Sequence, residues 1–320
     1  MTIQPLDHVP TREDILDTAQ AIRPLIHRTP VLTCETLNRM SGASLFFKCE
    51  NFQKIGAFKM RGAASAALRL TDEQRGRGIA THSSGNHAQA VARAAQVLGI
   101  PAYIVMPENA PDIKKKATEG YGAHIIFCAP TQAAREEALE RVVADTGAWF
   151  IHPYNDYNVI AGQATSALEL IEDTSCLDAL MAPVGGGGLM SGTALSAHYF
   201  APDTRVYGAE PERVNDAWRS FHSGKIETNA HTDTIADGLR TNLGDKTFAI
   251  LREHLEAIYT VSEESILEAM HLIWERMKII IEPSCAVPFA AVLAHPDVFR
   301  GQRVGIVLTG GNVDFREVWK

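Results

Sequence analysis

The chain has 320 residues, a length that suggests about two domains at roughly 150 residues each and provides enough material for a sizeable core. Its 30 Lys and Arg residues against 38 Asp and Glu residues give a net charge of −8, which disfavours a nucleic-acid partner because that partner is itself an anion. Hydrophobic residues make up 46% and charged residues 21% of the chain, which are the proportions of a folded protein and exclude a disordered one.

Five cysteines are spread along the chain without a C-x-x-C pair, at Cys34, Cys49, Cys128, Cys176 and Cys285. Their odd number and wide spacing suit a reducing cytoplasm better than a disulfide framework or a zinc ribbon. Residues 1–10 lack the basic start and apolar stretch of a secretory signal, and no apolar run elsewhere approaches the roughly 18 residues of a membrane span. We therefore expect a cytoplasmic protein without membrane contact.

The first segment that carries chemistry is 56–63, with the sequence GAFKMRGA. It places Lys59 beside the ring of Phe58 at the start of a predicted helix, in apolar surroundings that lower the pKa of an amine. A lysine of lowered pKa can form a Schiff base. A surface lysine at a helix start is the alternative, and the segment alone leaves both open.

From residue 78 onward, short apolar runs alternate with longer helical patterns, which is typical of an α/β protein with a mainly parallel sheet. The predicted elements are a strand at 78–81, a loop at 82–86, a helix at 87–98, strands at 102–106 and 124–127, and a helix from Thr131 to about Asp145. We expect residues 76–147 to form a small domain and residues 1–75 and 148–320 a large one.

The loop sequence HSSGNH at 82–87 gathers hydroxyls, an amide and backbone N–H groups at a strand-to-helix turn. Such a turn can bind a carboxylate, although simple helix capping would use the same residue types. The next predicted elements are helices at 159–171, 189–198, 246–254, 263–278 and 284–294 and strands at 178–183, 205–210 and 304–308.

Two glycine-containing turns follow apolar strands of this second series. The run from Gly185 to Gly188 precedes a predicted helix, so its N–H groups could hold a phosphate, or it could be only a tight turn. It matches neither the dinucleotide nor the nucleoside-triphosphate fingerprint. Thr309 stands before Gly310 and Gly311 at the carboxyl end of the last strand, where α/β proteins usually bind ligands.

In type and order these segments resemble the pyridoxal-phosphate enzymes of fold type II, within the branch of serine racemases and threonine or hydroxyaspartate dehydratases. The resemblance extends from about residue 29 to residue 314 and includes 152–153, 161–163, 236–238 and 282–283. It implies a tryptophan synthase β-like fold, in which two open α/β domains have the active site between them.

The resemblance also implies a set of cofactor contacts. Lys59 would join the pyridoxal phosphate aldehyde, with Phe58 beside it, while Asn86 would contact the phenolic oxygen and Thr309 the pyridine nitrogen. The remaining cofactor-binding residues would be Gly185, Gly186, Gly187 and Gly188 for the phosphate, and Glu282. Because a hydroxyl does not keep the pyridine ring protonated, this arrangement favours elimination over transamination.

The substrate contacts implied by the resemblance centre on the loop before the helix at 87–98. Ser83, Ser84, Asn86 and His87 would bind the α-carboxylate, with Arg135 nearby. Ser84 could also exchange the α-proton on the face opposite Lys59, which leaves racemisation open, or it could be a capping hydroxyl.

A divalent cation is implied near residue 210. Glu210, the Val214 carbonyl and Asp216 match the family's cation ligands, and hard oxygen donors suit Mg²⁺, or Ca²⁺ or Mn²⁺. A solvated acidic loop is the alternative for these residues. The family also implies a homodimer, and some of its racemases bind a nucleotide effector where Tyr121 and Asn312 match.

Ala57 departs from the family, because many members have serine there. Arg240 follows the segment 236–239, and if its side chain points inward it could pair with a second substrate carboxylate. We therefore expect a lyase that removes water from 3-hydroxyaspartate and gives iminosuccinate, or oxaloacetate and ammonia. A serine or threonine dehydratase and a serine racemase are the alternatives.

Overall fold

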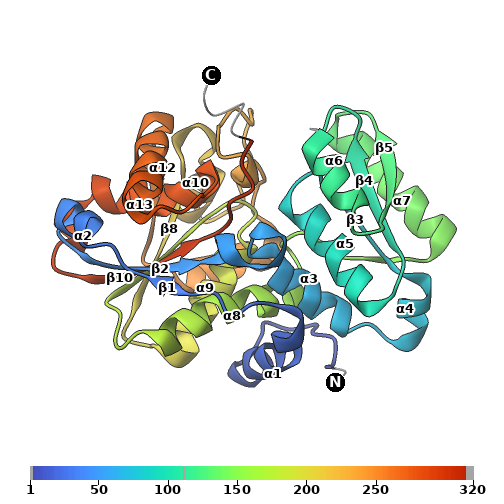
Figure 1. Ribbon diagram of the computed structural model, residues 1–320, viewed down its shortest axis with the longest axis horizontal. Coiled ribbons are helices and arrows are strands. Elements are labelled where there is room, and N and C mark those ends of the chain that lie inside the picture. Colours follow the sequence, from blue (N-terminus) through green and yellow to red (C-terminus); the bar gives the residue numbers. More distant parts are fainter. Residues whose placement is uncertain (1–2, 111, 315–320) are drawn as a thin grey trace.

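The strands form two sheets that lie in separate lobes of the computed structural model, which describes residues 3–110 and 112–314 (Figure 1). The larger sheet has the order β1-β2-β10-β7-β8-β9, and only β1 runs antiparallel to its neighbour. Its strands are β1 (Val31–Leu32), β2 (Ser44–Cys49), β7 (Ala179–Pro183), β8 (Arg205–Pro211), β9 (Ala257–Val261) and β10 (Arg303–Leu308).

The smaller sheet is parallel throughout, with the order β5-β4-β3-β6. Its strands are β3 (Ile79–His82), β4 (Ala102–Pro107), β5 (His124–Cys128) and β6 (Trp149–Phe150). Strand β6 lies just beyond the segment 76–147, and we propose that the small domain extends through it. The predicted α/β class is confirmed, because helices surround two sheets whose strands are mainly parallel.

Helices cover both faces of the larger sheet. Helices α8 and α9 pack on one face and α12 and α13 on the other, which buries the strands on both sides and explains their continuous apolar runs. The helices of this lobe are α1 (Arg12–Ile22), α2 (Glu35–Ser41), α8 (Tyr157–Asp173), α9 (Gly188–Phe200), α10 (Asp216–Ser223), α11 (Asp245–His254), α12 (Glu263–Met277), α13 (Pro283–Ala294) and α14 (Pro296–Phe299).

The smaller sheet has α5 and α6 on one side and α7 on the other. The helices before and around this sheet are α3 (Lys59–Leu68), α4 (Asp72–Arg77), α5 (Asn86–Leu98), α6 (Asp112–Glu119) and α7 (Gln132–Thr146). Short 3-10 turns are η1 (Arg23–Leu25), η2 (Glu50–Phe52), η3 (Lys54–Gly56), η4 (Glu212–Val214) and η5 (Asp237–Leu239). Helix α3 packs against α8 of one lobe and α5 of the other, so it lies where the lobes meet.

A buried charge network fixes the start of α3. The Arg61 guanidinium donates to both carboxylate oxygens of Glu50, at 2.7 and 2.8 Å, and to both of Glu169, at 2.8 Å each. The Lys48 amine lies 2.7 Å from Glu169 and completes the network. Because β2 supplies Lys48, Glu50 follows β2 and α8 supplies Glu169, these ion pairs tie α3 to both elements.

The strand ends bring the segments of chemical interest to one region. The loop 83–85 follows β3, residues 151–156 follow β6, the glycine loop (residues 185–188) follows β7, and Thr309 follows β10. In parallel α/β sheets the carboxyl ends of strands are where ligands bind. The topology therefore places the predicted site between the two sheets.

Candidate active site

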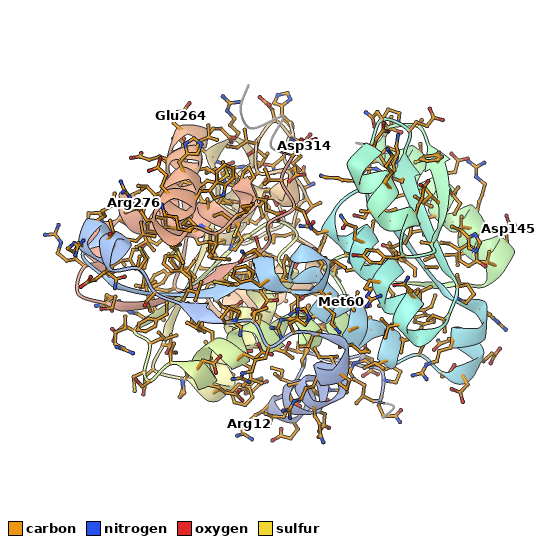
Figure 2. All side chains as sticks on the ribbon, viewed as in Figure 1. Arg12, Met60, Asp145, Glu264, Arg276 and Asp314 are labelled. Atoms are coloured by element: carbon orange, nitrogen blue, oxygen red, sulfur yellow. The ribbon has the colours of Figure 1, made fainter. Side chains whose placement is uncertain are left out.

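Lys59 is the first residue of α3, and Figure 2 labels its neighbour Met60 at the junction of the two lobes. The Lys59 Nζ donates a hydrogen bond to the backbone carbonyl of Pro153 at 2.8 Å and lies 5.2 Å from the centre of the Phe58 ring. Burial lowers the pKa of this amine to about 8, although the carboxylate of Glu282 opposes the shift. The amine therefore loses its proton more readily than an ordinary lysine, as Schiff-base chemistry requires.

Each of the four glycines in the loop has neighbouring atoms where a side chain would lie. A Cβ at Gly187 would lie 2.8 Å from the Thr247 Cβ, and Gly187 has a φ of +86°, which favours glycine. A Cβ at Gly185 would lie 3.1 Å from the Gly238 carbonyl oxygen in η5. No described side chain caps the start of α9, so its first N–H groups can receive an anion.

Two consecutive residues connect Lys59 to the glycine loop. Pro153 accepts the hydrogen bond of the Lys59 amine, and the ring of Tyr154 lies so close to Gly186 that a Cβ there would be 2.3 Å from it. Phe58 packs against the apolar cluster that flanks the loop and includes Val184. The amine and the glycine loop thus belong to one site.

Asn86 links the two lobes through Glu282. Its Nδ2 donates to the two carboxylate oxygens of Glu282 at 3.0 and 3.2 Å, and its Oδ1 accepts from the Asn312 amide at 2.8 Å. Burial raises the pKa of Glu282 to about 7, and the negative charge of Asp237 adds to the shift. The Glu282 carboxyl that Asn86 contacts is therefore partly protonated near neutral pH.

The Thr309 hydroxyl is buried at the end of β10. Its Oγ1 has no nitrogen or oxygen hydrogen-bond partner within residues 3–110 and 112–314, and the Cys285 thiol is the polar side chain beside it. A thiol is a weak hydrogen-bond partner, so a ligand atom is expected to supply a stronger one. Its position after β10 fits the predicted contact with a pyridine nitrogen.

The loop after β3 places two serine hydroxyls at the start of α5. Ser83 and Ser84 are half-buried, and the Ser83 Oγ accepts from the Gly85 N–H at 3.2 Å. Gly85 caps α5 without a side-chain hydrogen bond, so neither hydroxyl is used as a helix cap. His87 differs from them: its ring is buried, and its Nε2 lies 3.1 Å from the Ile151 carbonyl. Burial lowers the pKa of His87 well below its usual value, so the ring is neutral.

The two predicted substrate arginines lie on segments beside the site. Arg135 in α7 donates to the Thr131 carbonyl at 3.4 Å, and its charge helps lower the pKa of His82 at the end of β3, after burial. Arg240 is exposed, and its guanidinium donates to the Thr234 carbonyl at 2.7 Å in its own loop. In this structure, then, each guanidinium contacts its own segment.

The predicted cation ligands form a buried acidic pair at the end of β8. Glu210 accepts from the backbone N–H groups of Ala217 and Trp218, and Asp216 accepts from the Leu243 N–H at 3.1 Å. Burial raises the pKa of Asp216 to about 6 and that of Glu210 well above its usual value. Among the described residues no group of three or more His, Cys, Asp or Glu side chains could hold a metal ion, so a site here would need the backbone carbonyl of Val214.

An ion pair that the sequence does not predict also joins the two lobes. The Lys114 amine in α6 lies 2.7 Å from the Asp237 carboxylate in η5. The sequence predicts no role for His152 or Tyr154, because the two-residue strand β6 that positions them is too short to show a pattern. The signal available was their place just after an apolar strand end.

The uncapped glycine loop, the lysine of lowered pKa and the buried Thr309 hydroxyl fit a phosphate, an aldehyde and a pyridine nitrogen. The fold and site thus define an enzyme that holds an aldehyde cofactor through a lysine. A family model described as "Pyridoxal-phosphate dependent enzyme" matches residues 22–310. The chain belongs to this family, and the predicted enzyme class is confirmed.

Known proteins of the same family are closely similar over nearly the whole chain. A β-hydroxyaspartate dehydratase of Paracoccus denitrificans is 50% identical over 307 residues, 96% of this chain and 98% of that protein. An L-threo-3-hydroxyaspartate ammonia-lyase of Saccharomyces cerevisiae is 48% identical over 309 residues, covering 96% and 95%. The crystal structure of serine racemase from Dictyostelium discoideum has a TM-score of 0.92 at 46% identity, covering 95% of this chain and 99% of that one.

The sequence predicts no membrane-spanning segment. None of the helices in the described part of the chain has both the length and the apolar character needed to cross a bilayer.

Proposed function

We propose that the chain is a lyase that removes water from 3-hydroxyaspartate. The observation that carries this proposal is the 50% identity to a β-hydroxyaspartate dehydratase over 96% of the chain. The hydroxyaspartate ammonia-lyase at 48% identity supports the same substrate. The products would be iminosuccinate, or oxaloacetate and ammonia after water has been added back.

The residues that would hold pyridoxal phosphate come from both lobes. Lys59 would bind the aldehyde, the glycine loop the phosphate, Asn86 the phenolic oxygen and Thr309 the pyridine nitrogen, with Phe58 and Glu282 beside them. When bound, the cofactor supplies an electron sink for negative charge at the substrate's α-carbon.

The side chains around the cofactor would have separate roles in the elimination. The Lys59 amine, which the site holds near a pKa of about 8, would take the α-proton as a general base. Ser83, Ser84 and Asn86 would hold the α-carboxylate at the uncapped start of α5, where the helix dipole favours an anion. His87, neutral and bonded to a carbonyl, would complete this wall of the site.

A second carboxylate distinguishes hydroxyaspartate from serine and threonine, and Arg240 is our candidate to bind it. Its guanidinium would have to leave the Thr234 carbonyl, which it contacts at 2.7 Å, and turn toward the site. Arg135, whose charge helps to lower the pKa of His82 at the end of β3, would support the α-carboxylate. A charged hydrogen bond of roughly 1.5–3 kcal/mol would favour the dicarboxylic substrate about 10- to 150-fold.

Serine racemase is the second candidate, and Ser84 is the residue that favours it. Its hydroxyl is half-buried and free of helix capping, so it could carry a proton on the face of the substrate opposite Lys59. The 46% identity to a serine racemase of known structure supports this alternative. Dehydration of serine or threonine would use the same lysine.

A divalent cation at Glu210, Val214 and Asp216 is a further part of the proposal. The two buried carboxylates would be stabilised by Mg²⁺, Ca²⁺ or Mn²⁺, which prefer oxygen ligands. Asp216 also accepts from the Leu243 N–H, and the Leu243 side chain contacts Gly187 in the glycine loop. Through Asp216 and Leu243, the cation would thereby help to hold the glycine loop in place.

Homodimer formation, a nucleotide effector at Tyr121 and Asn312, and a cytoplasmic location remain predictions. The Asn312 amide already donates to Asn86 and to the Ile55 carbonyl, each at 2.8 Å, so an effector there would act directly on Asn86. Tyr121, the other residue predicted to bind the effector, has the Arg93 guanidinium 5.9 Å from its ring centre.

Ammonia release from serine, threonine and the four stereoisomers of 3-hydroxyaspartate, with and without Mg²⁺, tests the proposal. We expect a hydroxyaspartate isomer to give the highest kcat/KM, and Arg240→Ala to lower that value while leaving serine turnover unchanged. Arg213→Ala, an exposed arginine paired with Asp233, is the matched control. Turnover confined to serine or threonine would contradict the substrate assignment, and an unchanged Arg240→Ala would remove Arg240 from it.

A further inference from the structure

We propose that Tyr154 is a positioning residue that holds the glycine loop in the shape needed to bind the cofactor phosphate. Pyridoxal phosphate would not contact its ring in this role; the ring would act through the backbone of the loop. The inference rests on the proposed role of residues 185–188 as the phosphate site.

The ring of Tyr154 lies directly against Gly186. A Cβ at Gly186 would be 2.3–2.5 Å from the ring atoms Cγ, Cδ1 and Cδ2, distances that real contacts do not reach. A Cβ at Gly188 would be 2.9 Å from both the Cα and the Cβ of Tyr154. Two of the four glycines are therefore needed because this one residue occupies the space beside them.

Gly186 is also held by α11. The Thr247 hydroxyl donates to the Gly186 carbonyl at 2.9 Å, so this residue contacts both that hydroxyl and the tyrosine ring. Fixing the carbonyl in this way also fixes the direction of the next N–H group. Loss of the ring would leave the loop free to move toward the space that it vacates.

Tyr154 is itself held by His152. The His152 Nδ1 accepts from the backbone N–H of Tyr154 at 3.2 Å and from that of Asn155 at 2.9 Å, and the His152 and Tyr154 rings meet edge to face with centres 4.7 Å apart. Burial lowers the pKa of His152 to about 4, so the imidazole stays neutral and can accept both hydrogen bonds.

The other end of the segment is anchored to α11. The Asn155 amide donates to the Asp245 carboxylate at 2.7 Å, and its oxygen accepts from the Lys246 N–H at 3.1 Å. Together with the bond from Lys59 to Pro153, these contacts fix residues 152–155 on both sides of the tyrosine. The ring is thus a rigid support and not a mobile cover.

Within the described residues, the hydrogen bond that Tyr154 forms comes from its backbone N–H and not from its phenol. The loop is therefore supported by packing of the ring and not by a hydrogen bond of the phenol. Tyr154→Phe is therefore the conservative variant that should behave like the wild type. Tyr154→Ala removes the support, and Gly186→Ala adds a methyl group that would collide with the ring.

The test measures dissociation constants for pyridoxal phosphate and for pyridoxal, which lacks the phosphate, by titrating the visible absorbance of the full chain. We expect the wild type and Tyr154→Phe to prefer the phosphorylated form strongly. Tyr154→Ala should reduce this preference about tenfold or more while leaving the affinity for pyridoxal nearly unchanged. Gly186→Ala should reduce it as well, and much less so in the Tyr154→Ala background.

An unchanged preference in Tyr154→Ala, or additive effects of the two substitutions, would overturn the role of Tyr154. A wild type that binds pyridoxal as well as the phosphorylated cofactor would overturn the assignment of the glycine loop itself. Circular dichroism of the cofactor-free variants shows whether they are folded. If Tyr154→Ala is not, Tyr154→Val, which also leaves most of the space of the ring empty, takes its place with the same two outcomes.

Discussion

The Asn86 amide in one lobe donates to both carboxylate oxygens of Glu282 in the other, at 3.0 and 3.2 Å. This bond joins the start of α5 to the residue at the N-terminus of α13, whose charge also acts on the Lys59 amine. Since the carboxyl is buried, the charged form is disfavoured and the pKa of Glu282 rises to about 7. The link between the lobes therefore contains a group that titrates near neutral pH.

Glu282→Gln should stabilise the cofactor-free protein at high pH. The pKa of Glu282 is raised on folding, so the wild type loses stability as the pH rises from about 4.5 through 7, whereas glutamine does not titrate. We expect the variant to match the wild type at pH 5 and to exceed it by roughly 1–3 kcal/mol at pH 8. Urea denaturation at both pH values measures this difference. A variant that is equally less stable at both would contradict the raised pKa.

The rate at which the cofactor-free protein recaptures pyridoxal phosphate should follow the ionisation of Lys59. With a pKa of about 8, lowered by burial, the neutral amine becomes scarcer below pH 8. We expect the rate of appearance of the visible band to rise about tenfold per pH unit up to pH 8 and to level above it. A rate that still climbs tenfold per unit at pH 10 would indicate an ordinary lysine.

Much of the site is readable from the sequence because its residues lie in short, distinctive segments. The start of α3 at Lys59, the glycine loop and the loop after β3 each combine a strand or helix boundary with an unusual residue type. Strand β2 is harder to recognise, because Lys48 interrupts its apolar run and is satisfied by Glu169, which is distant in the sequence. Neither this pairing nor the contact of Tyr154 with Gly186 has a local signal, since both depend on tertiary packing.

Glu169→Ala should be strongly destabilising. Its carboxylate pairs with Arg61 and Lys48, both of which are fully buried, and removal would leave their charges without this partner. We expect a loss of roughly 3–5 kcal/mol in the free energy of unfolding. Glu172→Ala is the matched control, because Glu172 pairs with Arg28 at the exposed surface and should contribute at most about 1 kcal/mol. Equal losses of unfolding free energy in the two variants would show that the buried network stabilises the fold no more than a surface ion pair does.

Removal of divalent cations should lower the thermal midpoint of the wild type. A cation bound at the proposed site of Glu210 and Asp216 would stabilise the folded chain by mass action, by about 3 kcal/mol when its concentration is a hundred times its dissociation constant. Chelator should lower the midpoint, and excess Mg²⁺ should restore it. Asp216→Asn should abolish this response, whereas Asp233→Asn, at an exposed acid, should keep it. A thermal midpoint that does not change with chelator would exclude a bound cation at this site.

Borohydride reduction shows whether the amine of Lys59 holds the cofactor. Reduction of the protein saturated with pyridoxal phosphate, followed by digestion and mass spectrometry, locates the modified lysine. We predict that the label falls on the peptide containing Lys59 and that Lys59→Ala loses both the label and the visible band. A label on another lysine of the wild type, or its survival in Lys59→Ala, would contradict the account.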